Sequence, residues 1–253
     1  MVKKRGQITI FVILGIVILA TIILLISFRK EIIPPSSQTS INAQMKEVKQ
    51  IVESCLENSA KGPIEKIALQ GGYLSPSQDT FRLWNDTPIS YLCFNIEDQD
   101  YCRNRLLTLQ NMESQLSKAI EESLPECLDF DNVRGVNIKT KGKPKVSVQI
   151  LPLQVLVDLE YPVTVESKVS DAKASTNKFS YIVDKPLGDL YNVAQDILDQ
   201  ETTTGQFDQL TYMLLKLGKY TIYVQKPYPD KIYRLKLRED NFMFQFAVQG
   251  EPS

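Results

Sequence analysis

The sequence contains no histidine among its 253 residues. This absence excludes nucleophiles activated by histidine, as in Ser/His and Cys/His pairs, and it excludes histidine as a general base. It also excludes every zinc site that needs an imidazole ligand. The commonest catalytic and metal-binding arrangements of enzymes are therefore missing from this chain.

Other signatures of enzymes are missing too. The sequence has no Walker loop, no G-x-G-x-x-G, no G-x-S-x-G and no D-x-D-x-D-G calcium loop. Glu121-Glu122, or Asp129 with Asp131, are paired acids that can form a carboxylate dyad or bind a cation, but on an exposed helix or in a turn such pairs usually only contact solvent. A Ser/Lys dyad stays open, because its partners need not be neighbours in sequence. We predict no enzymatic activity and no cofactor, and we name no catalytic or metal-binding residue.

Charge of one sign is not in excess. The chain has 29 Lys and Arg against 30 Asp and Glu, a formal net charge of −1. Such a balance does not indicate a surface that binds a polyanion, so we predict no nucleic-acid partner.

What the sequence does have is one long apolar run, Ile8 to Phe28, without a charged residue. As a helix these residues would span about 31 Å, close to the hydrocarbon core of a bilayer. We therefore predict a transmembrane helix within residues 1–30, with membrane lipid as a partner. A cleaved secretory signal is the alternative, but its apolar region would be shorter and would end in a small-residue cleavage site.

Basic residues decide the predicted orientation. Lys3, Lys4 and Arg5 precede the apolar run, whereas only Arg29 and Lys30 follow it before Glu31. The positive-inside rule then puts the amino terminus in the cytoplasm. The predicted location is the cell membrane, crossed once, with the carboxyl-terminal domain extracellular.

The string Lys4-Arg5-Gly6-Gln7-Ile8-Thr9-Ile10 resembles the class III signal of archaeal type IV pilin-like proteins. The resemblance implies cleavage between Gly6 and Gln7 by a prepilin peptidase, with other pilin-like or surface proteins as partners. Many pilins carry glutamate at the fifth mature position, which is Phe11 here. A simple signal-anchored surface protein therefore remains the rival interpretation.

The rest of the chain predicts an exported α+β domain of amphipathic helices and antiparallel sheet. We place a Pro/Ser hinge at 31–40, a helical, disulfide-stapled region at 41–130, and an α+β region ending in a three-stranded meander at 131–253. An even number of cysteines in an exported domain indicates two disulfides. Cys55, Cys93, Cys102 and Cys127 allow three pairings. We favour Cys93 with Cys102, which flank a short polar segment, and Cys55 with Cys127, each of which lies in or at the end of a predicted helix; free thiols or a four-cysteine metal site is the alternative.

Helical spacing of apolar residues runs from Ile41 to Gln70, and Gly62-Pro63 should kink or split that helix. Its stripe is either a packing face of the domain or a contact with a partner helix. Gln70-Gly71-Gly72-Tyr73 should end the helix, and a second helix should precede Pro125. This order of a helix with one cysteine, a Gln-Gly-Gly-Tyr turn and an acidic helix before a second cysteine also resembles membrane-anchored proteins of small archaea without an assigned activity. That resemblance favours linking Cys55 with Cys127.

The segment from Leu74 to Arg105 is predicted to be irregular. Its aromatic residues are either the core of the segment or the lining of a ligand groove, and they are Trp84, Phe81 and Tyr91 together with Tyr73. Asn85-Asp86-Thr87 fits the N-glycosylation sequon, which makes Asn85 a candidate glycosylation site.

From Val133 the apolar period changes to two, which predicts strands around 136–138, 146–150, 155–159 and 163–165, and another at Phe179 to Val183. Residues 167–177 are predicted to be turn-like. Two helices should follow, one with a buried face from Leu187 to Leu198 and one with Phe207, Leu210, Leu214 and Leu217 inward and Gly218 as its stop. The tail predicts strands at 220–225, 232–238 and 242–248. Lys231, Arg234, Lys236 and Arg238 there form either a solvated outer face or a basic ligand face.

These features favour a membrane-anchored extracellular structural or interaction protein, in the pilin-like case a minor subunit processed after Gly6. A membrane-tethered binding module for a solute, glycan or partner protein is the alternative. A tethered hydrolase comes third.

Overall fold

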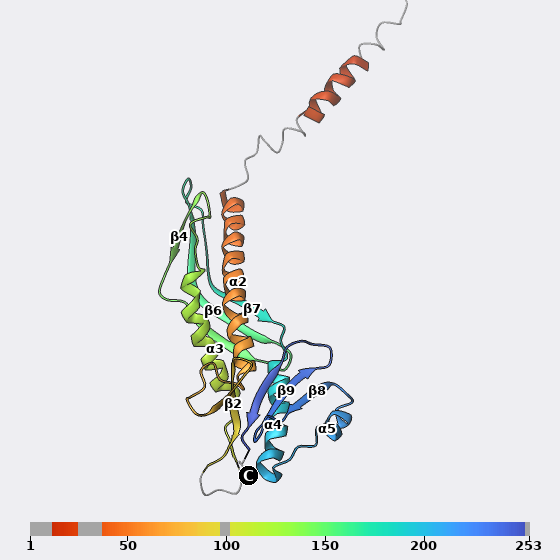
Figure 1. Cartoon of the computed structure of the whole chain (residues 1–253). Coiled ribbons are helices and arrows are strands. Elements are labelled where there is room, and N and C mark those ends of the chain that lie inside the picture. The colour runs from red at the N-terminus through yellow and green to blue at the C-terminus, as the bar shows by residue number, and fades with distance from the viewer. Residues whose placement is uncertain (1–11, 25–36, 97–101, 251–253) are drawn as a thin grey trace, which may run out of the picture.

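The computed structural model describes residues 12–24, 37–96 and 102–250, and over these residues the chain has an α+β fold with two sheets (Figure 1). Residues 12–24 are helical. The remaining elements, in chain order, are α2 (Ser37–Leu69), β1 (Phe81–Trp84), β2 (Thr87–Phe94), β3 (Arg103–Asn104), α3 (Leu109–Ser123), η1 (Leu124–Glu126), β4 (Val136–Thr140), β5 (Lys145–Ile150), β6 (Val155–Ser167), β7 (Lys173–Val183), α4 (Leu187–Thr204), α5 (Gln209–Leu215), β8 (Tyr220–Gln225), β9 (Lys231–Leu237) and β10 (Phe244–Val248).

The predicted transmembrane helix is wrong. Over the described ranges, no helix is both long enough and apolar enough to cross a bilayer. The described helical residues 12–24 extend about 20 Å, against about 30 Å of hydrocarbon, and residues 8–11 and 25–28 of the predicted span lie outside the described residues. The longer α2 carries charged residues such as Lys46, Glu47 and Lys49. The basic residues before the apolar run, the cleavage site Gly6-Gln7 and residues 31–36 of the predicted hinge lie outside the described residues.

The first sheet is built on the long strand β6. Its two halves pair on one side with β5 and β4, and β7 pairs along the other side, all antiparallel. Helices α2 and α3 run along this sheet. Side chains of α3 also hydrogen-bond the outer edge of β5: the Ile150 N–H donates to Glu113 at 2.8 Å and the Val148 N–H to Ser117 at 3.0 Å. This edge strand is therefore covered by its own chain.

The second sheet has the order β1-β2-β10-β9-β8, with the short β3 paired to β2. The tail strands form the predicted antiparallel meander. Strand β2 joins β10 in parallel, from a part of the chain more than a hundred residues earlier, and the sequence pattern did not indicate this pairing. Helix α4 packs against β9 and β10, and α5 lies beside β8.

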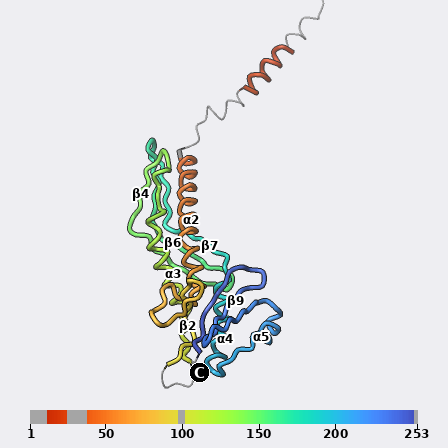
Figure 2. Tube along the Cα trace, in the orientation of Figure 1, coloured from red at the N-terminus to blue at the C-terminus, as the bar shows by residue number. Residues whose placement is uncertain are grey.

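One continuous core connects the two sheets. The carboxyl end of α2 meets the second sheet, as the chain trace shows (Figure 2). There the Ser90 hydroxyl donates to the Gln70 carbonyl at 2.6 Å, and the Gln245 amide donates to the Leu69 carbonyl at 2.8 Å. These bonds satisfy carbonyls that the end of a helix leaves without partners.

The apolar stripe of α2 is a packing face of the domain. Its members are all buried: Met45, Val48, Val52, Cys55, Ser59, Ile64, Ile67 and Ala68. Gly62-Pro63 does not split the helix, because α2 continues to Leu69. Glycine before proline has no Cβ to clash with the proline ring, which lowers the cost of helical backbone there. Gly71 and Gly72 end the helix with positive φ, and the Gly72 N–H donates to the Ile67 carbonyl at 2.7 Å, as in a Schellman cap.

Two predicted irregular segments are strands instead. Residues 74–105 contain β1, β2 and β3, and residues 173–177 belong to β7. Asn85 and Asp86 form the turn between β1 and β2, both with positive φ, which is the pattern of a tight hairpin turn. Residues 37–40 of the predicted hinge belong to α2.

The favoured disulfide pairing is confirmed. Cys55 pairs with Cys127, with Cα atoms 5.5 Å apart, and Cys93 pairs with Cys102, with Cα atoms 5.2 Å apart. The first bond joins α2 to the end of η1. The second closes the segment between β2 and β3.

Candidate functional site

The predicted aromatic groove is divided between two packing clusters. Trp84 and Tyr91 pack on a small cluster of Ile89, Ile232 and Ala247 on one face of the second sheet. Tyr73 packs against the main core, and its hydroxyl donates to the Arg105 carbonyl at 2.6 Å. Trp84, Tyr91 and Tyr73 are partly buried and pack against the core, whereas Phe81 is half-buried at the start of β1 and belongs to neither cluster. Asn85 is exposed in the β1–β2 turn.

The paired acids of the sequence do not form a site. Asp129 accepts from the Asp131 N–H at 2.9 Å, which is a local turn, and Glu121 accepts from the Val146 N–H at 3.3 Å. Within the part of the chain that the structure describes, no group of three acidic or cysteine side chains could hold a metal ion.

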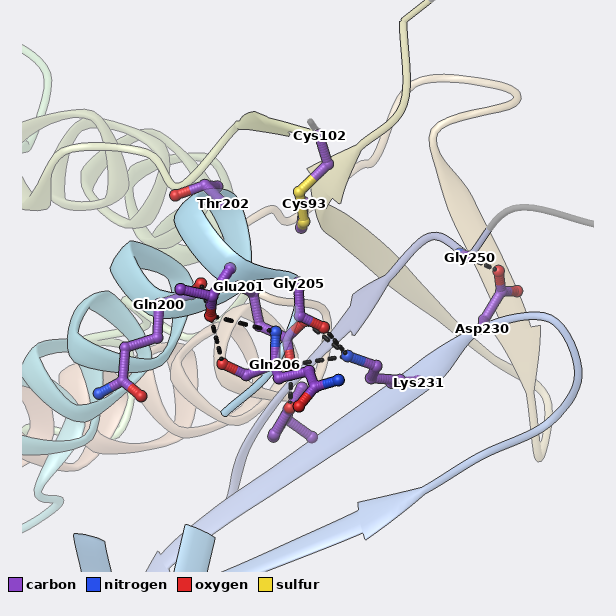
Figure 3. Close-up of polar contacts among 12 residues, drawn as sticks. Cys93, Cys102, Gln200, Glu201, Thr202, Gly205, Gln206, Asp230, Lys231 and Gly250 are labelled. Atoms are coloured by element: carbon purple, nitrogen blue, oxygen red, sulfur yellow. Dashed lines mark hydrogen bonds and ion pairs between the residues drawn. A yellow bond between two sulfur atoms is a disulfide. The ribbon is translucent and has the colours of Figure 1, made fainter. Parts of the chain in front are cut away.

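The basic residues of β9 lie on both faces of the sheet, because successive residues of a strand point to opposite faces. Lys231 points inward, where its ammonium group bonds the Glu201 carboxylate at 2.7 Å and the Gly205 carbonyl at 2.7 Å (Figure 3). Arg234 and Lys236 lie on the opposite, outer face, and Arg238 is exposed beyond the strand. The prediction that these residues share an outer face is therefore wrong for Lys231 and is confirmed for Arg234 and Lys236.

Glu201, at the end of α4, is a carboxylate buried under the second sheet. Its side chain is 1% exposed and accepts bonds from both Lys231 and the Tyr233 hydroxyl. Burial, followed by the bond to Glu201, raises the pKa of Tyr233. A buried charge needs this compensation, because an unpaired ion in the interior is costly. The cluster therefore fixes the carboxyl end of α4, just before the loop that leads into α5, against β9.

A second buried carboxylate, Asp230, stands at the start of β9. It binds the Arg82 guanidinium, accepts from the Tyr91 hydroxyl at 2.7 Å and accepts from the Gly250 N–H at 3.0 Å. Figure 3 shows the last of these bonds. Burial and the bond to Asp230 raise the pKa of Tyr91 to about 12. Both carboxylates are fully engaged by partners of the fold, so their geometry supports a structural role.

The most unusual surface of the described domain surrounds α5. Leu210, Leu214, Leu215 and Leu217 are 64%, 77%, 76% and 93% exposed, and we call these four residues the leucine surface. The prediction that Leu210, Leu214 and Leu217 point inward is therefore wrong. Phe207 packs on the core as predicted, and Tyr212 and Met213 pack there in place of the leucines. The apolar period of this helix fits two opposite faces, and the aromatic and methionine face is the one that is buried.

Local bonds hold α5 in place. The Asp208 carboxylate caps its first turn by accepting from the Thr211 N–H at 3.1 Å. The Tyr212 hydroxyl donates to Asp196 of α4 at 2.7 Å, and the Gly218 N–H donates to the Met213 carbonyl at 2.9 Å, with Gly218 in the left-handed region. The leucine surface is thus presented on an anchored element.

Two hollows adjoin this surface. One, of about 480 Å³, lies over the outer face of β8 and β9 and is lined by Tyr223, Arg234 and Lys236 among others. The second, of about 520 Å³, lies between the start of α5 and β8 and is lined by Phe207, Leu210 and Lys226 among others. Gln209 and Val224 line both hollows. Sequence reasoning missed this site, although the excess of leucine over one short helix was a usable signal.

Comparison of the chain with protein-family models, with curated proteins and with solved structures found no match.

Proposed function

We propose that this chain is a structural or interaction protein of an extracellular compartment, and that it binds another protein through the leucine surface. The observation that carries the proposal is the exposure of four leucines within eight residues, at 64% or more each. Burying a leucine side chain contributes about 1.5–3 kcal/mol. An exposed apolar patch with polar residues around it is typical of a surface that binds another protein.

The extracellular location is supported by the two disulfides, since such bonds persist mainly in oxidising compartments. The carboxylates Glu201 and Asp230 are bound by partners within the fold, which supports a structural rather than a catalytic role for them. Trp84, which would have marked an aromatic groove for a solute, is packed on a small apolar cluster.

A pilin-like subunit is the second candidate, and it is compatible with the first. The described side chains of the helix at 12–24 are all exposed, which leaves its apolar surface available to neighbouring subunits. Mass spectrometry of the mature protein tests this route. A first residue of Gln7 is expected if a prepilin peptidase cuts after Gly6, whereas a chain beginning at Met1 or Val2 argues against it.

The interaction proposal is tested by site-specific photo-crosslinking in the cells that produce the protein. A photoreactive residue at Leu214 is expected to give a discrete adduct with one protein, identified by mass spectrometry. The control position is Val169, which is 93% exposed at the tip of the β6–β7 hairpin. Equal labelling from both positions, or no adduct from Leu214, would contradict the proposal.

A further inference from the structure

Strand β8 is the last strand of the second sheet, and its outer edge has backbone groups that no strand pairs. The Arg238 N–H donates to the Lys219 carbonyl at 3.0 Å, and bonded and non-bonded pairs alternate along an antiparallel ladder. Thr221, Tyr223 and Gln225 therefore bond to β9. Ile222 and Val224 turn their N–H and C=O groups toward the free edge.

The protein covers this edge only in part. The Ile222 N–H meets the Met213 sulfur of α5 at 3.4 Å, and thioethers are weak acceptors. No hydrogen bond is recorded at the outward groups of Val224 within the described residues. By contrast, α3 caps the edge of β5 with side chains at Val146, Val148 and Ile150. Natural proteins usually protect an exposed edge, so an open one next to an apolar surface indicates a binding position.

The two hollows lie on opposite faces of β8 at Val224. Side chains of an added strand would alternate between them, because successive residues of a strand point to opposite faces. The outer hollow offers Arg234 and Lys236, neither of which forms an ion pair in the described structure. The inner hollow offers Phe207 and Leu210.

Two buried acceptor atoms also lack partners at this position. They are the Oε1 atoms of Gln209 and Gln225. A buried acceptor without a donor is costly, and a turn of either amide toward the free edge would let its Oε1 accept from an N–H group of an incoming chain.

We propose that the free edge of β8 at Val224 binds an extended segment of the partner protein in which acidic and apolar residues alternate. The acidic side chains meet Arg234 and Lys236, and the apolar ones enter the hollow beside Phe207. The inference rests on the proposed function and names the chemistry of its partner. A second copy of β8 fits poorly, since β8 has no acidic side chain to meet Arg234 and Lys236.

The test uses the full chain and a labelled eight-residue peptide of alternating valine and glutamate, followed by fluorescence anisotropy. Arg234→Glu with Lys236→Glu is expected to weaken binding by about tenfold or more. Lys141→Glu with Lys143→Glu, on the exposed β4–β5 turn, makes the same change in net charge and should leave affinity within about twofold. A valine and lysine peptide should not bind.

Backbone pairing is tested with Val224→Pro, which removes an outward N–H and is tolerated on an edge strand. This variant should lose the peptide while keeping the wild-type unfolding transition. In the wild type, the peptide should slow hydrogen exchange at the Val224 amide, a readout that needs no variant.

Unchanged exchange at Val224, or equal binding of the lysine peptide, would overturn the inference. The inference would also be overturned if an acidic polysaccharide such as alginate bound more tightly than the peptide and its binding were unaffected by Val224→Pro. A partner crosslinked from Leu214 in the absence of peptide binding would refute only this inference, whereas loss of both results would refute the proposed function as well.

Discussion

Buried carboxylates hold the second sheet together, and Glu201 is the most enclosed of them. We expect Glu201→Gln to lower the free energy of unfolding by about 2–4 kcal/mol, because it leaves the Lys231 ammonium without its counterion. The lower end applies if Lys231, whose side chain is 27% exposed, turns toward water. Urea unfolding with the disulfides intact measures the change.

The matched control is Lys139→Met, which breaks the surface ion pair between Lys139 and Glu166. The Lys139 side chain is 65% exposed, so little change in stability is expected. Similar losses in the two variants would contradict the role given to Glu201.

Tyr91 makes stability depend on alkaline pH. Its pKa in the folded protein is raised to about 12 from an ordinary value of 10.0, so the folded state holds this proton more tightly than the unfolded state. The stabilisation is complete below about pH 10 and is lost as the pH rises toward about 12. Tyr91→Phe should therefore show a smaller fall in the urea midpoint between about pH 9 and pH 11 than the wild type. An identical fall in both proteins would show that Tyr91 titrates normally.

Helix α5 separates the residues that fold the domain from those we assign to binding. Leu214→Ala should change the free energy of unfolding by about 0.5 kcal/mol or less, since Leu214 is 77% exposed. Leu198→Ala in α4 removes the same atoms from a fully buried position and should cost about 2–5 kcal/mol. Differential scanning calorimetry of the two variants checks the contrast. A large loss at Leu214 would mean that the leucine surface is part of the core.

Elements with a single strong apolar period could be predicted from the sequence. The stripe of α2 from Met45 to Ala68 predicts one helical face, although not whether the domain or a partner helix covers it, and the glycine end at Gly71 and Gly72 follows from backbone sterics. The cysteine positions favour the nested disulfides without excluding the other pairings. The existence of helix α5 could be predicted but its buried face could not, because Leu210 and Leu214 are as apolar as Tyr212 and Met213, and only tertiary packing decides which face is buried.

Strands β1 and β2 illustrate a different limit. Asn85 and Asp86 both adopt positive φ and form a hairpin turn. The same residues begin a glycosylation sequon, so their sequence alone does not indicate the turn. The parallel pairing of β2 with β10 joins Tyr91 to Ala247, and no local pattern encodes a contact over that separation. The leucine surface lies beside β8 of this sheet, so the excess of leucine in the sequence signals an unusual helix but does not by itself place it in the fold.

The whole domain is stabilised by two crosslinks of different reach. Cys55–Cys127 has a sequence separation of 72 residues and Cys93–Cys102 one of 9. In the loop-entropy model these contribute about 4 and about 3 kcal/mol. Replacing Cys55 and Cys127 by alanine should therefore lower the unfolding midpoint more than replacing Cys93 and Cys102, as thermal unfolding can measure. The reverse order would show that the segment between β2 and β3 contributes more than its length suggests.

Binding of another protein by the leucine surface is measured most directly as the affinity of the purified chain for the partner crosslinked from position 214. Leu210→Ser, Leu214→Ser and Leu217→Ser together are predicted to raise Kd by about tenfold or more, whereas Val169→Ser leaves it within about twofold. If the triple variant binds that partner as tightly as the wild type does, the leucine surface is not the binding site.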